Sequence, residues 1–393
     1  MYSVRPALQP YAWGTPGDIP ELLGIAPPGG PVAEAWWGDH SVAPARCSMD
    51  GVEVGLDRLI AADPDSALGP DLAGEFEGRL PFLLKVLAIG SPLSIQVHPS
   101  VRAATAGFAR EEAARIPLDS PQRTYRDRNH KPELLVALTP MVVLSGFRPA
   151  DDIRRDVERL DHPEAAALAA GLVDPEDDGE AIARFVRRCL EGSDAPGLVA
   201  AVVRSASEGG ASLNVNAAAA AATYYPADGG VLVALAMNRL DLEPGEACFT
   251  PDGIVHSYQS GVGLEVMANS DNVVRAGLTP KHVDIDELLA VASTAPGPPV
   301  RPRATRTRGA ETFPESADEF ALSLVREGVG SFPANPWIVL VLEGEATVST
   351  GRGGERTLAR GEAAFVPFAD GDLAVASTGL VAVAGCPAPS RRT

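Results

Sequence analysis

Apolar residues dominate the segment from Pro81 to Leu93, interrupted at Lys85 and Gly90, and this pattern predicts a buried strand. The segment leads directly into Gln96-Val97-His98-Pro99. Because side chains alternate between the two faces of a strand, Gln96 and His98 are expected on the same face. An amide oxygen beside an imidazole makes half of a metal site, so the other ligands are sought elsewhere in the chain.

Two kinds of pattern divide the rest of the chain. Residues 101–116 predict a helix, and residues 151–209 have helical spacing, with an apolar stripe along 182–190. After Pro226, short apolar runs such as Val231–Met237 and Ala247–Thr250 are separated by Pro-Gly and Asp-Gly turns and predict strands.

The last part of the chain repeats the strand-and-turn pattern after a Pro- and Arg-rich connector at 294–309. Glu343-Gly344-Glu345 resembles the earlier turn Pro244-Gly245-Glu246, which predicts a second jelly roll. This part contains no histidine, so we expect it to be free of metal.

The expected fold is mainly β with a helical insertion. A first jelly-roll domain takes residues 1–148 and 226–300, and the helical insertion takes 149–225. A metal-free jelly roll takes 301–393.

Composition narrows the class of protein. A chain of 393 residues with 45% apolar and 22% charged residues is typical of a soluble globular protein, and no apolar run reaches the roughly 20 residues of a membrane helix. The first residues do not resemble a signal peptide, so a cytoplasmic protein without a membrane partner is expected. The four cysteines are scattered and predict neither disulfides nor a thiolate zinc site. A net charge of −19 argues against nucleic acid as the main partner.

Only three of the 33 basic residues are lysines, and the rest are arginines. Lys85, Lys131 and Lys281 all lie in segments that also contain other candidate site residues. This placement favours a functional role for a compact ammonium group. Chance placement is the alternative. Trp13, Trp36 and Trp37 stand beside polar residues and suit a sugar-binding wall, although tryptophans that simply fill a core are the better explanation when these residues are taken alone.

The candidate metal ligands are His98, Gln96, Glu133 and His256, because each lies in a dense polar segment at the end of a predicted strand. Strands far apart in sequence become neighbours in a jelly roll, so the spacing is no obstacle. A buried, satisfied histidine is the usual explanation of any one of them, but four such segments together favour a metal. Such an ion would act as a Lewis acid on a hydroxyl or carbonyl oxygen.

An anionic substrate needs local positive charge in this acidic chain. Lys131, Arg275, Lys281, Lys85 and Arg128 are the candidates. Arg275 follows a polar turn and is expected to enter the pocket, with an ion pair to Asp271 or Glu265 as the alternative.

Four motifs together resemble type I mannose-6-phosphate isomerase, a family of the cupin superfamily. They are Gln96-Val97-His98-Pro99, His130-Lys131-Pro132-Glu133, Leu144-Ser145-Gly146-Phe147-Arg148-Pro149 and the long segment from Met267 to Lys281. The resemblance covers essentially the whole chain. It departs mildly before His256 and around Arg126–Asn129.

The resemblance implies the reaction and the roles of the site residues. One zinc ion is bound by Gln96, His98, Glu133 and His256, and mannose 6-phosphate is interconverted with fructose 6-phosphate through a cis-enediol. Arg275 and Lys131 are implied to be catalytic. The residues implied to bind the substrate are Tyr258, Glu265, Lys85, Ser94, Lys281 and Trp13.

Some questions stay open at this point. The base that carries the proton is Glu265, His98, Lys131 or a zinc-bound water. A monomer acting on a small-molecule sugar phosphate is expected. The rival functions are an iron-dependent jelly-roll oxygenase, which a glutamine ligand fits poorly, and a sugar-phosphate-binding protein without catalysis.

Overall fold

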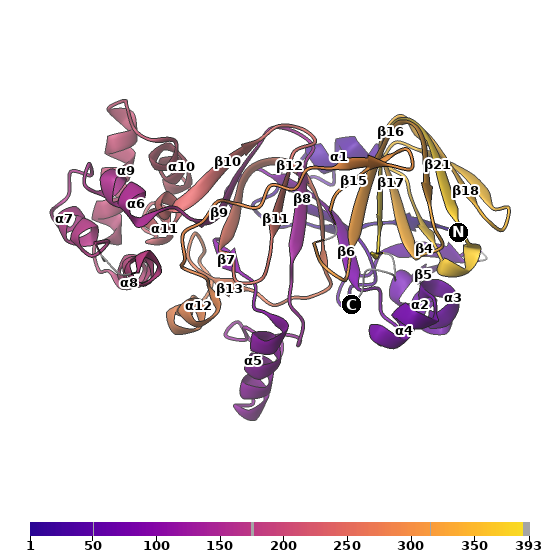
Figure 1. Cartoon of the computed structure of the whole chain (residues 1–393), viewed down its shortest axis with the longest axis horizontal. Helices are drawn as coiled ribbons and strands as arrows, with labels where there is room; N and C mark the ends of the chain where they lie inside the picture. The colour runs from indigo at the N-terminus through magenta and orange to yellow at the C-terminus, as the bar shows by residue number, and fades with distance from the viewer. Residues whose placement is uncertain (50, 174–176, 315, 388–393) are drawn as a thin grey trace.

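The structure is a computed structural model that describes residues 1–49, 51–173, 177–314 and 316–387. It is elongated, with helices gathered at one end, a sheet in the middle and a second sheet at the other end (Figure 1). The predicted architecture, mainly β with a helical insertion, is confirmed.

The middle sheet has ten strands and carries the predicted metal ligands. Its main path runs in the order β10-β9-β12-β6-β3-β2, while β8 joins β12 to β11 and β7 joins β12 to β13. The strands are β2 (Ala7–Gln9), β3 (Glu34–Trp37), β6 (Phe82–Ile89), β7 (Gln96–Val97), β8 (Glu133–Ala137), β9 (Met141–Phe147), β10 (Met237–Leu242), β11 (Ala247–Thr250), β12 (His256–Ala268) and β13 (Val274–Arg275).

The long strand β12 organises this sheet. Its first part pairs with β7 and β9, and its second part pairs with β6 and β8. The register with β9 shifts between Tyr258 and Ser260, and Gly261 follows with φ of 103°. A Cβ on Gly261 would lie 2.6 Å from the carbonyl oxygen of Pro140, so glycine is required where the strand changes partners.

The helical insertion lies at the far end from the second sheet (Figure 1). Its predicted apolar stripe is confirmed, since Ile182, Phe185 and Val186 are all buried. No described helix is both long and apolar enough to cross a membrane. The helices are α6 (Ala150–Val157), α7 (Pro163–Ala170), α8 (Asp178–Glu191), α9 (Ala195–Ser207), α10 (Leu213–Ala222) and α11 (Gly230–Ala236).

The strand predicted at Val231–Met237 is wrong, because residues 230–236 form α11 and only Met237 begins a strand. Every residue of α11 is buried, and the helix packs in the same apolar cluster as α8, α9 and α10. A short run that is apolar on all sides has no period, so sequence pattern cannot distinguish a helix from a strand there. The helices therefore continue past residue 225.

The second sheet contains three strands from early in the chain. Its path ends in β20-β1-β4-β5, so residues 2–5, 46–49 and 52–55 pair with a sheet otherwise built after residue 300. Its strands are β1 (Tyr2–Arg5), β4 (Arg46–Met49), β5 (Val52–Gly55), β14 (Thr305–Thr307), β15 (Ala310–Thr312), β16 (Ala321–Phe332), β17 (Trp337–Glu343), β18 (Glu345–Thr350), β19 (Glu355–Ala359), β20 (Ala363–Val366) and β21 (Leu373–Gly385).

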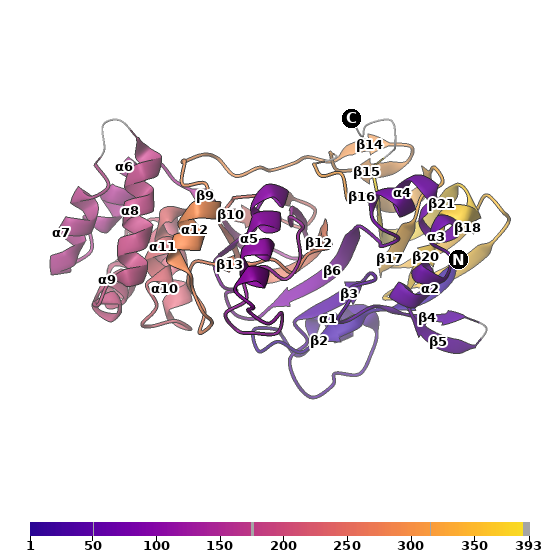
Figure 2. The same ribbon diagram turned by 90° about the horizontal axis from the view of Figure 1, so that it is seen from below.

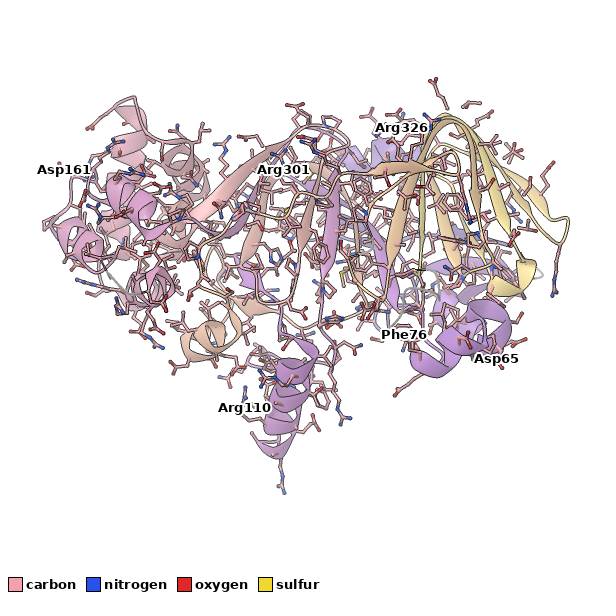
Figure 3. The ribbon with its side chains drawn as sticks, viewed as in Figure 1. Asp65, Phe76, Arg110, Asp161, Arg301 and Arg326 are labelled. Atoms are coloured by element: carbon pink, nitrogen blue, oxygen red, sulfur yellow. The ribbon has the colours of Figure 1, made fainter. Side chains whose placement is uncertain are left out.

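One apolar core joins the two sheets. It includes Leu84 of β6 and Val136 of β8 together with Leu340 of β17 and Phe365 of β20. The connector that bears Arg301 runs along the molecule from one sheet to the other (Figures 2 and 3). The two sheets are therefore held together by shared burial as well as by the chain.

Shorter helices complete the fold. The helix predicted at 101–116 is confirmed as α5, which ends at Ala113 and projects away from both sheets, as Arg110 marks in Figure 3. The others are α1 (Asp18–Leu23), α2 (Leu56–Ala62), α3 (Pro64–Leu68), α4 (Pro70–Glu75), α12 (Ile285–Val291) and the short 3-10 helix at Phe368–Asp370.

Candidate metal centre

His98, Glu133 and His256 converge at one end of the middle sheet. Glu133 begins β8, His256 begins β12, and His98 follows β7 directly, so three neighbouring strands place them. Their ligand atoms all lie within 4.8 Å of one another, and all three residues are buried. Gln96 lies on β7 in register with His256 on one side and Arg275 on the other.

The histidine rings are held so that their Nε2 atoms face Glu133. Nδ1 of His98 lies 2.8 Å from the carbonyl oxygen of Asn272, and Nδ1 of His256 lies 3.1 Å from that of Ile254. A carbonyl only accepts hydrogen bonds, so each Nδ1 carries the ring hydrogen and each Nε2 presents a lone pair.

This arrangement fits a divalent metal. The Nε2 atoms of His98 and His256 lie 3.2 and 3.3 Å from the two oxygens of Glu133, yet neither has a hydrogen-bond partner among the described residues. Lone pairs facing lone pairs at this distance are unfavourable unless a cation lies between them. Two atoms each about 2.0–2.1 Å from a tetrahedral zinc are about 3.3 Å apart, which matches these distances.

Asn272 connects the metal ligands to the loop that precedes β8. Its carbonyl oxygen accepts from His98, while its fully buried side chain accepts from the backbone N–H of Arg126 at 2.7 Å and donates to the carbonyl of Asn129 at 2.8 Å. The dense motif that contains Asn272 therefore fixes both a histidine ring and the loop carrying Arg126.

Glu133 has two further partners. Lys131 Nζ lies 2.9 Å from Oε1, and the Tyr258 hydroxyl donates to Oε2 at 3.0 Å. Burial alone would raise the pKa of Glu133, but charge attraction, led by Lys131, outweighs it and holds the pKa well below the ordinary value. Burial, with the nearby charge of Glu133, raises the pKa of Tyr258 well above its usual range. Tyr258 therefore remains a neutral donor to Glu133.

Lys85 lies between two buried carboxylates beside the metal ligands. Its Nζ is 3.5 Å from Glu34 and 3.4 Å from Glu265, and it lies 5.0 Å from the centre of the Trp36 ring. Burial would lower the pKa of Lys85, but Glu34 and Glu265 outweigh it and raise the pKa above the ordinary value. Burial and the charge of Glu133 raise the pKa of Glu265 to about 7.

Three cations, Arg126, Arg275 and Lys281, interact electrostatically with one another. Burial and Arg126 lower the pKa of Arg275, and burial, Arg275 and Arg126 lower that of Lys281. Among the described residues, none of the three has an ion pair, and the alternative pairing of Arg275 with Asp271 is not seen. Arg126 also lines a cavity of about 610 Å³, together with Asp271.

The structure places the other predicted residues less centrally. Trp13 stacks on Tyr11 with ring centres 6.0 Å apart, and Ser94 is half-buried just before β7. Arg128 lies over the ring of Phe108 at 5.1 Å and lines the same cavity as Arg126. Sequence reasoning missed Arg126 and Glu34; only the density of polar residues around Arg126 signalled its segment.

Comparisons with known proteins give a consistent family. The model described as phosphomannose isomerase type I, catalytic domain, matches residues 1–150. The mannose-6-phosphate isomerase of Salmonella typhimurium is 38% identical over 394 residues, which covers 97% of this chain and 98% of the relative. That of Homo sapiens is 33% identical over 324 residues, covering 75% of this chain and 74% of the relative.

Solved structures extend the similarity to the fold. A variant of phosphomannose isomerase from Salmonella typhimurium has a TM-score of 0.92 and 34% identity, and the match covers 99% of this chain and 100% of that one. A zinc-bound mannose 6-phosphate isomerase has a TM-score of 0.90 and 35% identity, with 98% and 99% covered.

Proposed function

The chain belongs to the type I phosphomannose isomerase family, and from this membership and its metal cluster we infer that it interconverts mannose 6-phosphate and fructose 6-phosphate. It is a zinc enzyme of the aldose–ketose isomerase class. The observation that carries the inference is the pair of buried Nε2 atoms, of His98 and His256, that lie 3.2 and 3.3 Å from the oxygens of Glu133 with no hydrogen-bond partner among the described residues.

We propose Gln96 as the fourth zinc ligand beside His98, Glu133 and His256. Its place on β7 between His256 and Arg275 supports this assignment. Bound zinc supplies positive charge that polarises a carbonyl oxygen and holds sugar oxygens. One carboxylate and three neutral ligands leave that charge largely uncompensated, which suits the stabilisation of an oxyanion.

The isomerisation moves a proton from C2 to C1 of the aldose through a cis-enediol, and a hydroxyl proton moves from O2 to O1. We propose that Glu265 carries the carbon-bound proton, because a carboxyl group with a pKa of about 7 both accepts and returns a proton near neutral pH. Lys85, at 3.4 Å, holds Glu265 in place and limits how far burial raises its pKa.

Positive side chains stabilise the negative charge that develops on the enediolate oxygens. We assign this role to Lys131, which lies against Glu133, and to Arg275, which lies in register with Gln96. Lys281 and Arg126 are proposed to hold the phosphate, since both carry charge beside Arg275 without a carboxylate partner among the described residues.

Tyr258 supports the site by donating to Glu133, and Trp13 and Ser94 are proposed to line the sugar pocket. The substrate is a small molecule. We also propose a monomer in the cytoplasm, with neither nucleic acid nor a membrane as partner; the burial of all four cysteines and the net charge of −19 support this. Gel filtration with light scattering tests the monomer.

A coupled assay with mannose 6-phosphate tests the function. Activity is expected to disappear after zinc is removed with a chelator and to return when zinc is added back. Stoichiometric iron in the purified protein together with oxygen-dependent turnover would contradict the isomerase assignment.

A further inference from the structure

A histidine outside the metal cluster connects the two sheets. His130 lies on the segment that enters β8, and its two ring nitrogens contact different carboxylates. Nδ1 is 3.0 Å from Asp252 and Nε2 is 2.7 Å from Glu319. Both nitrogens therefore donate, and the ring is an imidazolium held on both sides. These hydrogen bonds outweigh burial and raise the pKa of His130 to about 10.

Glu319 belongs to the part of the chain without metal ligands. It lies between β15 and β16. Phe313 before it and Phe320 after it in the chain are each only 2% exposed and belong to the core shared by the two sheets. One oxygen each of Glu319 and Asp252 is buried without a hydrogen-bond partner among the described residues. Both carboxylates thus depend on His130 for their compensating charge.

Asp252 leads from this contact to the metal ligands. It lies in the tight turn Pro251–Ile254, in which Gly253 has φ of 78°. The N–H of Gly253 donates to the carbonyl of His98 at 2.9 Å, and the carbonyl of Ile254 accepts from Nδ1 of His256. One turn therefore positions both histidine ligands.

We propose that Glu319 is a positioning residue for the zinc site. Through His130 and Asp252, Glu319 fixes the turn that orients His98 and His256. Through His130 it also fixes the backbone that leads into Lys131. The part of the chain that builds the second sheet therefore contributes to zinc retention and to the reaction rate. The kinetic part of this inference rests on the proposed function, whereas the zinc-retention part does not.

Two substitutions of Glu319 in the full-length zinc-loaded protein test the proposal. Glu319→Ala leaves His130 Nε2 without an acceptor, while Glu319→Gln keeps an acceptor and removes the charge. Zinc release to a chromogenic chelator is expected to be about tenfold faster in Glu319→Ala, the lower end of the effect of removing an outer partner of a ligand. In the same variant kcat is expected to fall, while KM changes by less than about twofold. Glu319→Gln is expected to have a zinc-release rate and a kcat between those of Glu319→Ala and the parent.

Glu311→Ala is the matched control. Glu311 lies in the same part of the chain and pairs with Arg326 at 2.9 Å, but both side chains are well exposed. Among the described residues, neither forms an ion pair with a metal ligand. This variant is expected to release zinc and turn over like the parent.

Several outcomes decide the matter. Parent-like zinc release and kcat in both Glu319 variants overturn the proposal, even when their melting temperatures fall. Additive effects of Glu319→Gln and Asp252→Asn in a double-mutant cycle also overturn it, because residues acting through His130 must couple. An inactive parent whose zinc release still responds to Glu319 substitution supports the positioning role and refutes the proposed function.

Discussion

Replacing Tyr258 with phenylalanine removes a single hydroxyl from the metal site. The hydroxyl donates to Glu133 Oε2 at 3.0 Å, and the residue is only 2% exposed. The ring packs in an apolar cluster with Leu87, Met141 and Val143, and phenylalanine keeps that packing. The substitution therefore isolates the hydrogen bond to the ligand.

The expected cost follows from the charge of the acceptor. A hydrogen bond to a charged group contributes about 1.5–3 kcal/mol, and removal of an outer partner of a metal ligand weakens binding roughly tenfold to a hundredfold. Glu133 retains Lys131 on its other oxygen, so it stays ionised but loses the donor that orients Oε2. We expect Tyr258→Phe to bind zinc about tenfold more weakly and to change KM little.

Competition with a chromogenic chelator measures the zinc affinity, and steady-state kinetics with saturating zinc measure KM. Tyr125→Phe is the control, because Tyr125 is also a fully buried tyrosine that donates to a carboxylate, Glu287, but lies away from the cluster. Unchanged zinc affinity with a raised KM in Tyr258→Phe would show that the hydroxyl binds substrate, and the reasoning above would be refuted.

Two other predictions concern charge. Arg275→Ala is expected to lower kcat by about 100-fold while zinc content stays at one per chain, because one stabilising donor to the developing oxyanion is lost; normal turnover would contradict its role. The second uses the pKa of His130, which is about 10 in the folded protein against an ordinary value of 6.5. The raised pKa of His130 stabilises the folded protein fully below pH 6.5, and this stabilisation is lost as pH rises through 10. The unfolding equilibrium constant then increases by at most about tenfold per pH unit. Urea unfolding between pH 7 and 10.5 should show a smaller loss for His130→Gln than for the parent, and equal losses would count against the raised pKa.

Sequence pattern located the ligand segments because metal chemistry concentrates polar residues at strand ends. Gln96, His98, Glu133 and His256 all stood out in this way, and the structure brings the two histidines and Glu133 within 4.8 Å. Glu34 did not stand out, because its role depends on the pairing of β3 with β6, which sets it near Lys85. A pairing between distant strands leaves no local mark in the sequence.

Arg126 and Arg128 illustrate the same limit at shorter range. The two arginines are two residues apart in one polar loop, and residue type does not distinguish them. The side chain of Asn272 fixes the backbone at Arg126, and Phe108 provides a ring for Arg128 to cover. Contacts supplied by the loop before β13 and by α5 therefore give the two arginines different surroundings.

The pairing of β1 with β20 has a consequence for the order of folding. Val4 lies opposite Ala363, so β1 has no partner on that side until the residues of β20 have been synthesised. Until then β1 presents an unpaired edge, which is a site for association with other chains. A ribosome-bound chain stopped at residue 300 should therefore depend on chaperones, although every proposed zinc ligand has already been synthesised.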